Sequence, residues 1–517
     1  MLNRLLSAFN RITNRDDVPH FKTRELEEIN YGKLSHSLHI NVENIKQAFG
    51  HSKDLNIREV KFPSKETIVL VFINGLINTN ELNKFVIEFL SFTLNDVKQS
   101  YKVLDLFEIK TIPTTSMLDL NTYEDVYSNI LDGLVIALLE GSNKGFALNF
   151  TGGDKRQIQD SQLEKNLRGP RDALVEDLDT NMSILRKKIK DIKLQVDDLT
   201  IGSRSKTKVN IVYMRDIANP NIVQDLKSRL ENIDYDNIQD GTYIGHLIND
   251  NPLSFFPLIL KTEKPDKIAA NLLEGRIAVI TENSPTALLL PSVFFDFLEV
   301  QDDYYDAFFI TVATRILRVI GLILATMSTP LYISLTAINI DMLPTKLAIP
   351  FSQIRYVVPF PLIVEVLIME ITLELLREAG LRIPNPIGPA VSIVGGLVIG
   401  QTAVNAGLTS PFLTIIVAIS AIGSFTIPSV DLVATLRIVK FFLVIGASVF
   451  GLYGIGMALT LLVIHINSIK TFGVPYLSPF NEEGIINSLK TIIRLPFIIT
   501  AKRHSYYRIN NKYKVRK

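Results

Sequence analysis

The chain has 517 residues, enough for about three folding units. Its 54 Lys and Arg residues balance 53 Asp and Glu residues, and the net charge of +1 argues against a nucleic-acid partner. The chain has no cysteine, which excludes disulfides, thiol catalysis and zinc sites built on cysteine.

Charged and apolar residues occupy different parts of the chain. Charged residues make up 21% of the total, yet the mean hydropathy is +0.23. Nearly all long apolar runs lie after Leu288. This division predicts an α/β cytosolic N-terminal half followed by an α-helical polytopic membrane domain. Residues 1–12 lack a signal-peptide pattern, so we expect the N-terminal half to remain in the cytosol.

The N-terminal half predicts two small α/β subdomains after a polar N-terminal segment at residues 1–37. In subdomain 1, residues 38–160, the β-branched run at 67–73 predicts a buried strand and the apolar spacing at 81–92 predicts a helix. The turn at 151–154 lacks the spacing of a phosphate loop, so we expect no nucleotide site.

Subdomain 2, residues 161–283, has predicted strands at 208–214 and 276–281 and a helix at 219–233. Its first part carries charges around an apolar helical stripe. These charges predict either a solvated helix face or a contact surface between subunits or domains. The residues proposed for an inter-subunit contact are Arg168, Arg171, Glu176, Asp177 and Arg186.

Residues 284–489 predict a helical membrane domain. The segment 294–309 alternates aromatic and acidic residues, so we expect it at the headgroup level with its rings buried and its charges wet. Five apolar segments follow as candidate spans. They are 316–338, 357–376, 389–406, 412–428 and 438–466.

The basic tail, residues 490–517, should be cytosolic by the positive-inside rule. Two cytosolic ends require an even number of crossings. We expect four crossings plus a re-entrant or interfacial segment; six would require one span that the hydropathy pattern does not separate.

Residues 359–407 form the most distinctive apolar stretch. Its first helix carries a cluster of ionisable groups, which are costly at membrane depth and face protein or water rather than lipid. We interpret the cluster either as carboxylates that attract ions or as structural pairs. Its members are Glu365, Glu370, Glu374, Arg377 and Glu378.

The second helix of this stretch has two distinct faces at helical spacing. Small residues form one face, on which another helix can approach closely, and the last span repeats this feature. These packing residues are Ser392, Gly396, Gly400, Ala403 and Gly407, with Gly451 and Gly454 in the last span. Valines and amides form the opposite face, which could line a pore with a valine constriction or pack against protein. The candidate pore-lining residues are Val391, Val394, Val398, Gln401 and Asn405.

Several stretches together resemble the A subunit of the GerA family of bacterial spore germinant receptors. They are LRGPRDALVEDLDTNMSILRKKI, PLYISLTAINIDMLPTKLAIPF, VPFPLIVEVLIMEITLELLREAGLRIPNPIG, VSIVGGLVIGQTAVNAG and the FTIPS stretch. The similarity spans about residues 65–500 in consistent order.

This resemblance implies a multi-pass protein of the spore inner membrane, with the N-terminal half and the tail in the cytosol. It implies a homo-oligomer whose helices form a nutrient-gated path for monovalent cations. A transporter-like B subunit and a lipoprotein C subunit are the implied partners, beside membrane lipid, and no cofactor is expected.

Two other classes compete with this interpretation. A secondary transporter also uses short helices with polar residues, but the sequence shows no internal repeat, and a structural scaffold subunit is a further alternative. An enzyme is not expected, because seven histidines are scattered and no metal spacing or nucleophile motif occurs.

Overall fold

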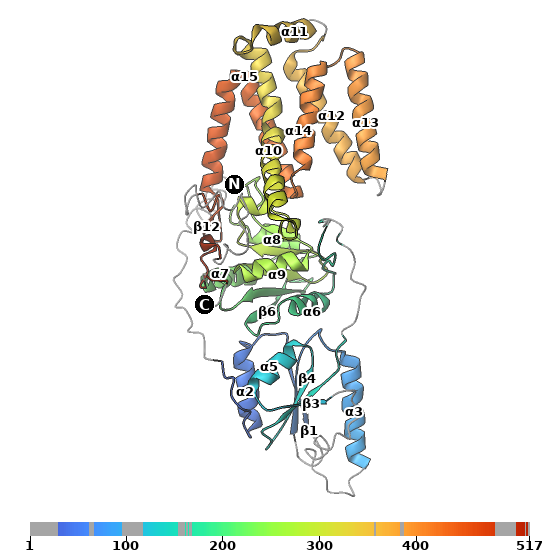
Figure 1. The fold of residues 1–517 in the computed structure, drawn as a ribbon, viewed down its shortest axis with the longest axis vertical. Coiled ribbons are helices and arrows are strands. Elements are labelled where there is room, and N and C mark those ends of the chain that lie inside the picture. Colours follow the sequence, from blue (N-terminus) through green and yellow to red (C-terminus); the bar gives the residue numbers. More distant parts are fainter. Residues whose placement is uncertain are drawn as a thin grey trace.

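The computed structural model describes residues 29–61, 67–95, 117–152, 161, 164, 168–355, 358–382, 387–480, 503–511, 513 and 514. Two α/β units and a helical half follow one another along the long axis of the molecule (Figure 1). The second α/β unit lies between the first unit and the helices, so it is the only unit next to the helical half in the described chain.

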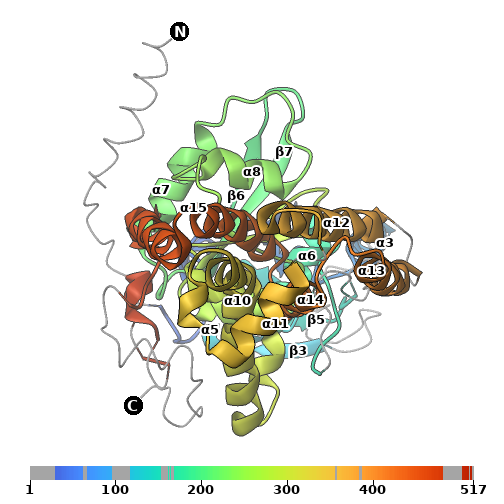
Figure 2. The ribbon, with the colours of Figure 1, turned by 90° about the horizontal axis from the view of Figure 1, so that it is seen from above.

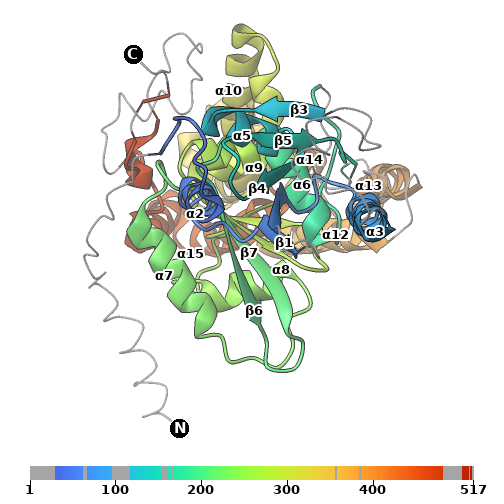
Figure 3. The ribbon, with the colours of Figure 1, turned by 90° about the horizontal axis from the view of Figure 1, so that it is seen from below.

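The first unit is a five-stranded antiparallel sheet with strand order β1-β2-β4-β5-β3. Its strands are β1 (Leu55–Lys61), β2 (Thr67–Ile73), β3 (Met117–Leu120), β4 (Val135–Leu139) and β5 (Gly145–Leu148). Helices α2 (Leu38–Ala48) and α5 (Tyr123–Leu131) cover one face, and α3 (Thr79–Asn95) covers the other (Figure 3). Because helices cover both faces, β2 is apolar and buried from Ile68 to Ile73 rather than alternating.

The second unit repeats this arrangement with strand order β6-β7-β9-β10-β8, again antiparallel. Its strands are β6 (Leu194–Ile201), β7 (Thr207–Met214), β8 (Leu260–Thr262), β9 (Ile277–Thr281) and β10 (Ala287–Leu290). Its helices are α6 (Leu178–Lys188), α7 (Pro220–Glu231), α8 (Gly241–Ile248) and α9 (Pro265–Leu273). The predicted fold class, two small α/β subdomains before a helical domain, is confirmed.

The two units have the same topology and share local sequence devices. The fourth residue of α2 is Asn41 and that of α6 is Asn181, and both are buried. Asn41 binds the backbone of Ser35 through N–H and C=O, at 2.8 and 2.7 Å, and Asn181 binds that of Val175 at 2.8 and 2.6 Å. Each amide therefore closes the loop that enters its helix.

A second repeated stretch runs into the fourth strand of each unit. It reads ILDGLVIALLEGS at 130–142 and LLEGRIAVITENS at 272–284. Both contain a glycine with positive φ, Gly133 at 87° and Gly275 at 94°. The expectation of no internal repeat is therefore wrong for the soluble half. The two units share burial pattern and backbone conformation more than residue identity, so the repeat is not evident from the sequence.

The second sheet extends beyond residue 283, the boundary expected from the sequence. Ala287–Leu290 is strand β10, which pairs with β9 on one side and β8 on the other. A four-residue apolar run before a membrane segment does not distinguish a buried strand from the start of a span.

The helical half contains α10 (Phe308–Ile333), α11 (Thr345–Arg355), α12 (Leu362–Arg382), α13 (Ile387–Asn405), α14 (Pro411–Phe425) and α15 (Val430–Ser468). Two helical segments in the described chain are long and apolar enough to cross a membrane, Phe308–Ile338 and Val430–Ser468. Helices α10 and α14 pack closely, since a methyl group on Gly423 would lie 2.6 Å from the carbonyl oxygen of Gly321.

The last segment, expected as one span, is a hairpin of two helices. Gly451 has φ 62° and ψ −137°, which ends the helical path. The second arm returns along the first, because a methyl group on Gly446 would lie 2.8 Å from the Gly454 carbonyl oxygen (Figure 2). Within the described chain the helical half thus makes six passes, through α10, α12, α13, α14 and the two arms of α15. The number of membrane crossings stays a prediction.

Part of the basic tail packs against the second unit. Ile509 is buried beside Gly275, and the Asn510 N–H donates to the Ile217 carbonyl at 3.0 Å. Tyr506 and Tyr507 are buried as well. The described tail residues therefore lie on the same side of the helical half as the soluble units.

Candidate functional site

A buried ion pair and a hydrogen bond connect three helices of the helical half. Glu370 of α12 and Lys440 of α15 are both buried and lie 2.5 Å apart. The Thr329 hydroxyl of α10 donates to Glu370 at 3.0 Å. A buried carboxylate with a cationic partner and a hydroxyl donor is satisfied, so it serves to position α12 against α10 and α15.

Glu365, one turn earlier in α12, has a different role. Its carboxylate accepts the backbone N–H of Ser410 at 2.5 Å and the Thr409 hydroxyl at 3.1 Å. Ser410 is the N-cap of α14, where a negative charge is favoured by the helix dipole. Glu365 therefore fixes the start of α14.

Glu374, just past the middle of α12, lies between two arginines. It binds Arg377 at 3.2 Å and Arg437 of α15 at 3.0 Å. The sequence left the α12 carboxylates open as ion-attracting or structural groups. The pairing of Glu365, Glu370 and Glu374 favours the structural alternative, while Glu378 is exposed.

The described polar residues of α13 are exposed. Val398 is 56% exposed, and Gln401 and Asn405 are exposed beside it. The side chains of Val391, Ser392 and Val394 lie outside the described residues. The amides on this uncovered helix face require hydrogen-bond partners, which either another protein surface or water can supply.

The small residues of α13 take up two environments. Gly400 is buried, and a methyl group there would lie 3.4 Å from Thr414 of α14. Gly396 has no such neighbour, while Ala403 and Gly407 are partly buried. Among the described residues of this face, Gly400 therefore meets another helix within this chain and Gly396 does not.

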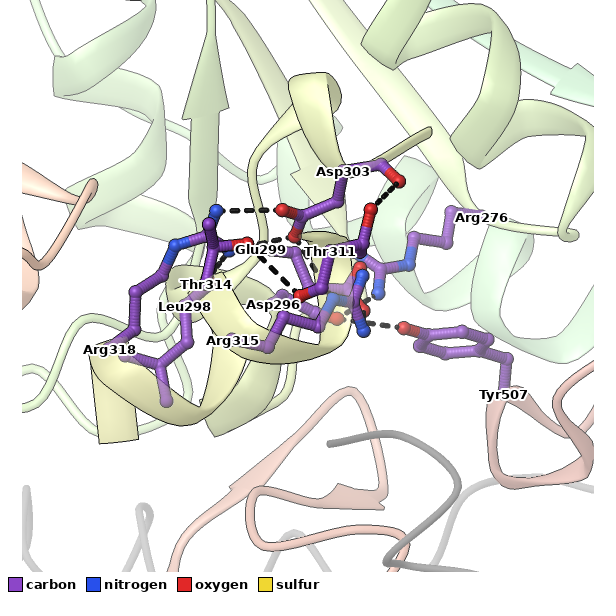
Figure 4. A network of polar contacts seen from close by, with 10 residues as sticks. All are labelled: Arg276, Asp296, Leu298, Glu299, Asp303, Thr311, Thr314, Arg315, Arg318 and Tyr507. Atoms are coloured by element: carbon purple, nitrogen blue, oxygen red, sulfur yellow. Dashed lines mark hydrogen bonds and ion pairs between the residues drawn. The ribbon is translucent and has the colours of Figure 1, made fainter. Parts of the chain in front are cut away.

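The segment between the second unit and α10 holds a second charged cluster, which we call the joint (Figure 4). It comprises Glu299, Asp303, Arg315 and Arg318. The buried Asp303 accepts two bonds from Arg318, each 2.7 Å, and one from Arg315 at 3.0 Å. Glu299 lies 3.3 Å from Arg315. The joint therefore fixes the first three turns of α10 to the segment that follows the second unit.

Asp296, just before the joint, is buried between the second unit and the tail. It pairs with Arg276, the residue before β9, and accepts the Tyr507 hydroxyl at 3.1 Å. The Arg276 guanidinium also lies 4.3 Å from the centre of the Tyr507 ring. Burial raises the pKa of Asp296 above its ordinary value, although Arg276 and the Val293 N–H oppose this shift.

These contacts correct the expectation of wet charges at 294–309, because Asp296 and Asp303 are both buried. The sequence reasoning also missed Lys440, Arg437, Arg315 and Arg318 as partners. The sequence did carry a signal for them, because a lysine or arginine inside an apolar helix is costly unless a carboxylate neutralises it.

The charged stretch of the second unit mainly serves contacts within the chain. Arg186 is fully buried, and its guanidinium binds Asp54 of the first unit at 2.6 and 3.0 Å. Arg168 pairs with Asp306 beside the joint, at 2.9 Å, and Asp177 caps α6. Arg171 and Glu176 are exposed. For Arg186 this placement favours the between-domain alternative over a contact between subunits.

The fold therefore combines a two-unit antiparallel α/β half with a bundle of apolar helices, two of which are long and apolar enough to cross a membrane in the described chain. A family model described as "Bacillus/Clostridium GerA spore germination protein" matches residues 43–506. The chain therefore belongs to the GerA family of spore germination proteins, and the resemblance seen in the sequence is confirmed.

Individual relatives are similar in sequence to this chain over nearly its whole length. Spore germination protein KA of Bacillus subtilis is 35% identical over 91% of this chain and 86% of that protein. Spore germination protein GerLA of Bacillus cereus is 36% identical over 90% and 94%. The uncharacterized membrane protein YfkQ of Bacillus subtilis is 32% identical over 96% of both chains.

One solved structure is also similar, the crystal structure of the N-terminal domain of the A subunit of the Bacillus megaterium spore germinant receptor GerK3. It shares 25% identity and covers 51% of this chain and 98% of its own, with a TM-score of 0.41. Membership of the family supports a role in a spore germinant receptor.

Proposed function

We propose that this chain is the A subunit of a spore germinant receptor and that copies of it assemble around a cation path in the spore inner membrane. A nutrient bound elsewhere in the receptor opens this path, and the efflux of monovalent cations starts germination. A transporter-like B subunit and a lipoprotein C subunit complete the receptor.

The observation that carries this proposal is the contrast between α12 and α13. The buried carboxylates of α12 are paired within the chain, whereas the Val398, Gln401 and Asn405 face of α13 is exposed. In a ring of copies this face would line the path, with Val398 as the apolar constriction and the amides as its wet continuation.

The position of the tail supports the proposed topology. Residues 503–511 pack on the second unit, which supports a topology with the α/β half and the described tail on one side of the bilayer. Such an arrangement requires an even number of crossings. The six helical passes satisfy this requirement, as four crossings also would.

The test compares Val398→Ala with Val449→Ala in spores that carry this chain as their receptor A subunit. Val449 lies on α15 and is 61% exposed, so the control removes the same methyl groups from an equally uncovered position. A wider constriction at Val398 should release potassium without nutrient, at normal protein level. Tight spores with an unchanged nutrient response would exclude Val398 from the gate and favour a scaffold role for α13.

A further inference from the structure

One turn of the second unit carries a leucine at its tip. Residues 251–254 form this turn, which is closed by the Ser254 N–H donating to the Asn251 carbonyl at 3.0 Å. Leu253 is 86% exposed there. Turn tips are dominated by Gly, Pro, Asn, Asp and Ser, and a leucine in water forgoes the gain from burial. The turn therefore has the character of a contact site.

The turn is fixed to the ends of α15. The Phe255 carbonyl accepts the hydroxyl of Thr435, near the start of the first arm, at 2.6 Å. The Phe255 ring stacks on His465, near the end of the second arm, with ring centres 5.1 Å apart. Anchoring at two points of the helical hairpin sets the level of Leu253 relative to the helices.

That level corresponds to the edge of a bilayer. The arms of α15 on either side of Gly451, residues 430–450 and 452–468, have 21 and 17 residues and therefore lengths of about 31 and about 26 Å. The hydrocarbon core of a bilayer is about 30 Å thick, so each arm needs its full length to cross it. Side chains bound to their last turns then lie among the lipid headgroups.

Helix α8 extends the same surface. Ile244, Gly245 and Ile248 are buried, whereas Tyr243, His246 and Leu247 are exposed on the opposite face. Seen from the side of the helices, α8 is not overlaid by the helical half (Figure 2). Tyrosine beside apolar residues is typical of headgroup contact, and the chain has no tryptophan to take that role.

We propose that Leu253, Phe255 and the exposed face of α8 form a lipid-contact surface that inserts into the headgroup region. The second unit then rests on the bilayer directly, in addition to its attachment through the joint. A second copy of the chain is the other possible cover, but the anchoring of the turn to the ends of a crossing hairpin favours lipid. The inference goes beyond ion conduction, and it depends only on the helical half lying in a bilayer.

The test uses tryptophan fluorescence of the full-length protein in vesicles of phosphatidylcholine and phosphatidylglycerol. Because the chain has no tryptophan, Leu253→Trp introduces the sole indole at a position that tolerates size. Ile87→Trp on α3 of the first unit is the distant control, and Phe309→Trp at the start of α10 reports correct insertion; both positions are exposed.

Lipids brominated near the headgroup should quench the Leu253→Trp variant at least half as strongly as the Phe309→Trp variant and leave Ile87→Trp unchanged. Two results would overturn the proposal. Red-shifted emission without quenching would mean that position 253 faces water, and blue-shifted emission without quenching would mean that protein covers it. Quenching of the Phe309→Trp variant in either case would show that the helical half itself remains in the bilayer.

Discussion

The two α/β units have one topology but different neighbours. In the described chain the first unit is bonded to the second, chiefly through the buried Asp54–Arg186 pair. The second unit contacts the ends of α15 through Phe255 and the tail through Gly275, and the segment that follows it is bonded to α10 in the joint. Position, rather than fold, therefore decides which unit can transmit a conformational change to the helices.

The largest effect is expected where the second unit meets α10. Asp303→Ala removes the buried carboxylate that the buried Arg315 and the partly buried Arg318 share, and breaking a buried ion pair typically costs about 3–5 kcal/mol. The variant should show a strongly lowered Tm of the purified full-length protein and a low level in spore membranes.

The matched control for Asp303 is Asp306→Ala, which breaks a pair with the largely exposed Arg168. Exposed pairs contribute about 0–1 kcal/mol, so this variant should stay near the parent protein. Equal stability of the two variants would mean that the joint does not hold α10.

The attachment of the first unit should be the next most sensitive contact. Arg186→Met leaves Asp54 buried without its cation and should cost about 3 kcal/mol or more. Hydrogen exchange should quicken in α2 and β1 of the first unit, while the helical half keeps its protection.

Lys190→Met serves as the control for Arg186, since it breaks the exposed Lys190–Asp132 pair across the same two units. Little change in exchange is expected for it. If Arg186→Met increased hydrogen exchange in the helical half as strongly as in the first unit, the attachment of the first unit would not be independent of the helical half.

Gly133 of the first unit and Gly275 of the second occupy equivalent positions, so replacing each in turn compares the surroundings of the two units, with a smaller expected effect on stability. Alanine at either position meets a positive φ, which costs about 1 kcal/mol. At Gly133 the nearest side-chain atom would be 3.3 Å from the added methyl group, whereas at Gly275 the methyl group would overlap Ile509 of the tail. Overpacking adds about 1–3 kcal/mol.

Gly275→Ala should therefore lower Tm more than Gly133→Ala and expose the tail to trypsin at Arg508. The double variant Gly275→Ala, Ile509→Ala should recover much of the difference. Equal behaviour of the two single variants would show that the tail does not pack on the second unit.

Local patterns were sufficient to predict much of the soluble half. The β-branched run at 67–73 is β2, the run at 208–214 lies within β7, and the helical spacing at 81–92 lies within α3. The hairpin at Gly451 was missed because hydropathy is the same along both arms and records no change of direction.

The charged partners could not be predicted, because contact between residues far apart in sequence depends on the packing of whole elements. Glu370 and Lys440 are separated by 70 residues, and Asp54 and Arg186 by 132. The sequence marked Glu370 and Arg186 as unusual, yet only the fold shows that each is neutralised within the chain.

The central claim, that the exposed face of α13 lines a cation path, is most directly tested by cysteine accessibility. Because the chain has no cysteine, Val398→Cys, Gln401→Cys and Asn405→Cys each introduce a single thiol, and Val449→Cys is the control on α15. Potassium release would be followed in spores after nutrient addition, with a membrane-permeant thiol reagent present or absent. The account predicts that the reagent reduces release in the α13 variants and leaves Val449→Cys and the parent unchanged. Unaltered release in all three α13 variants, with labelling confirmed, would contradict it.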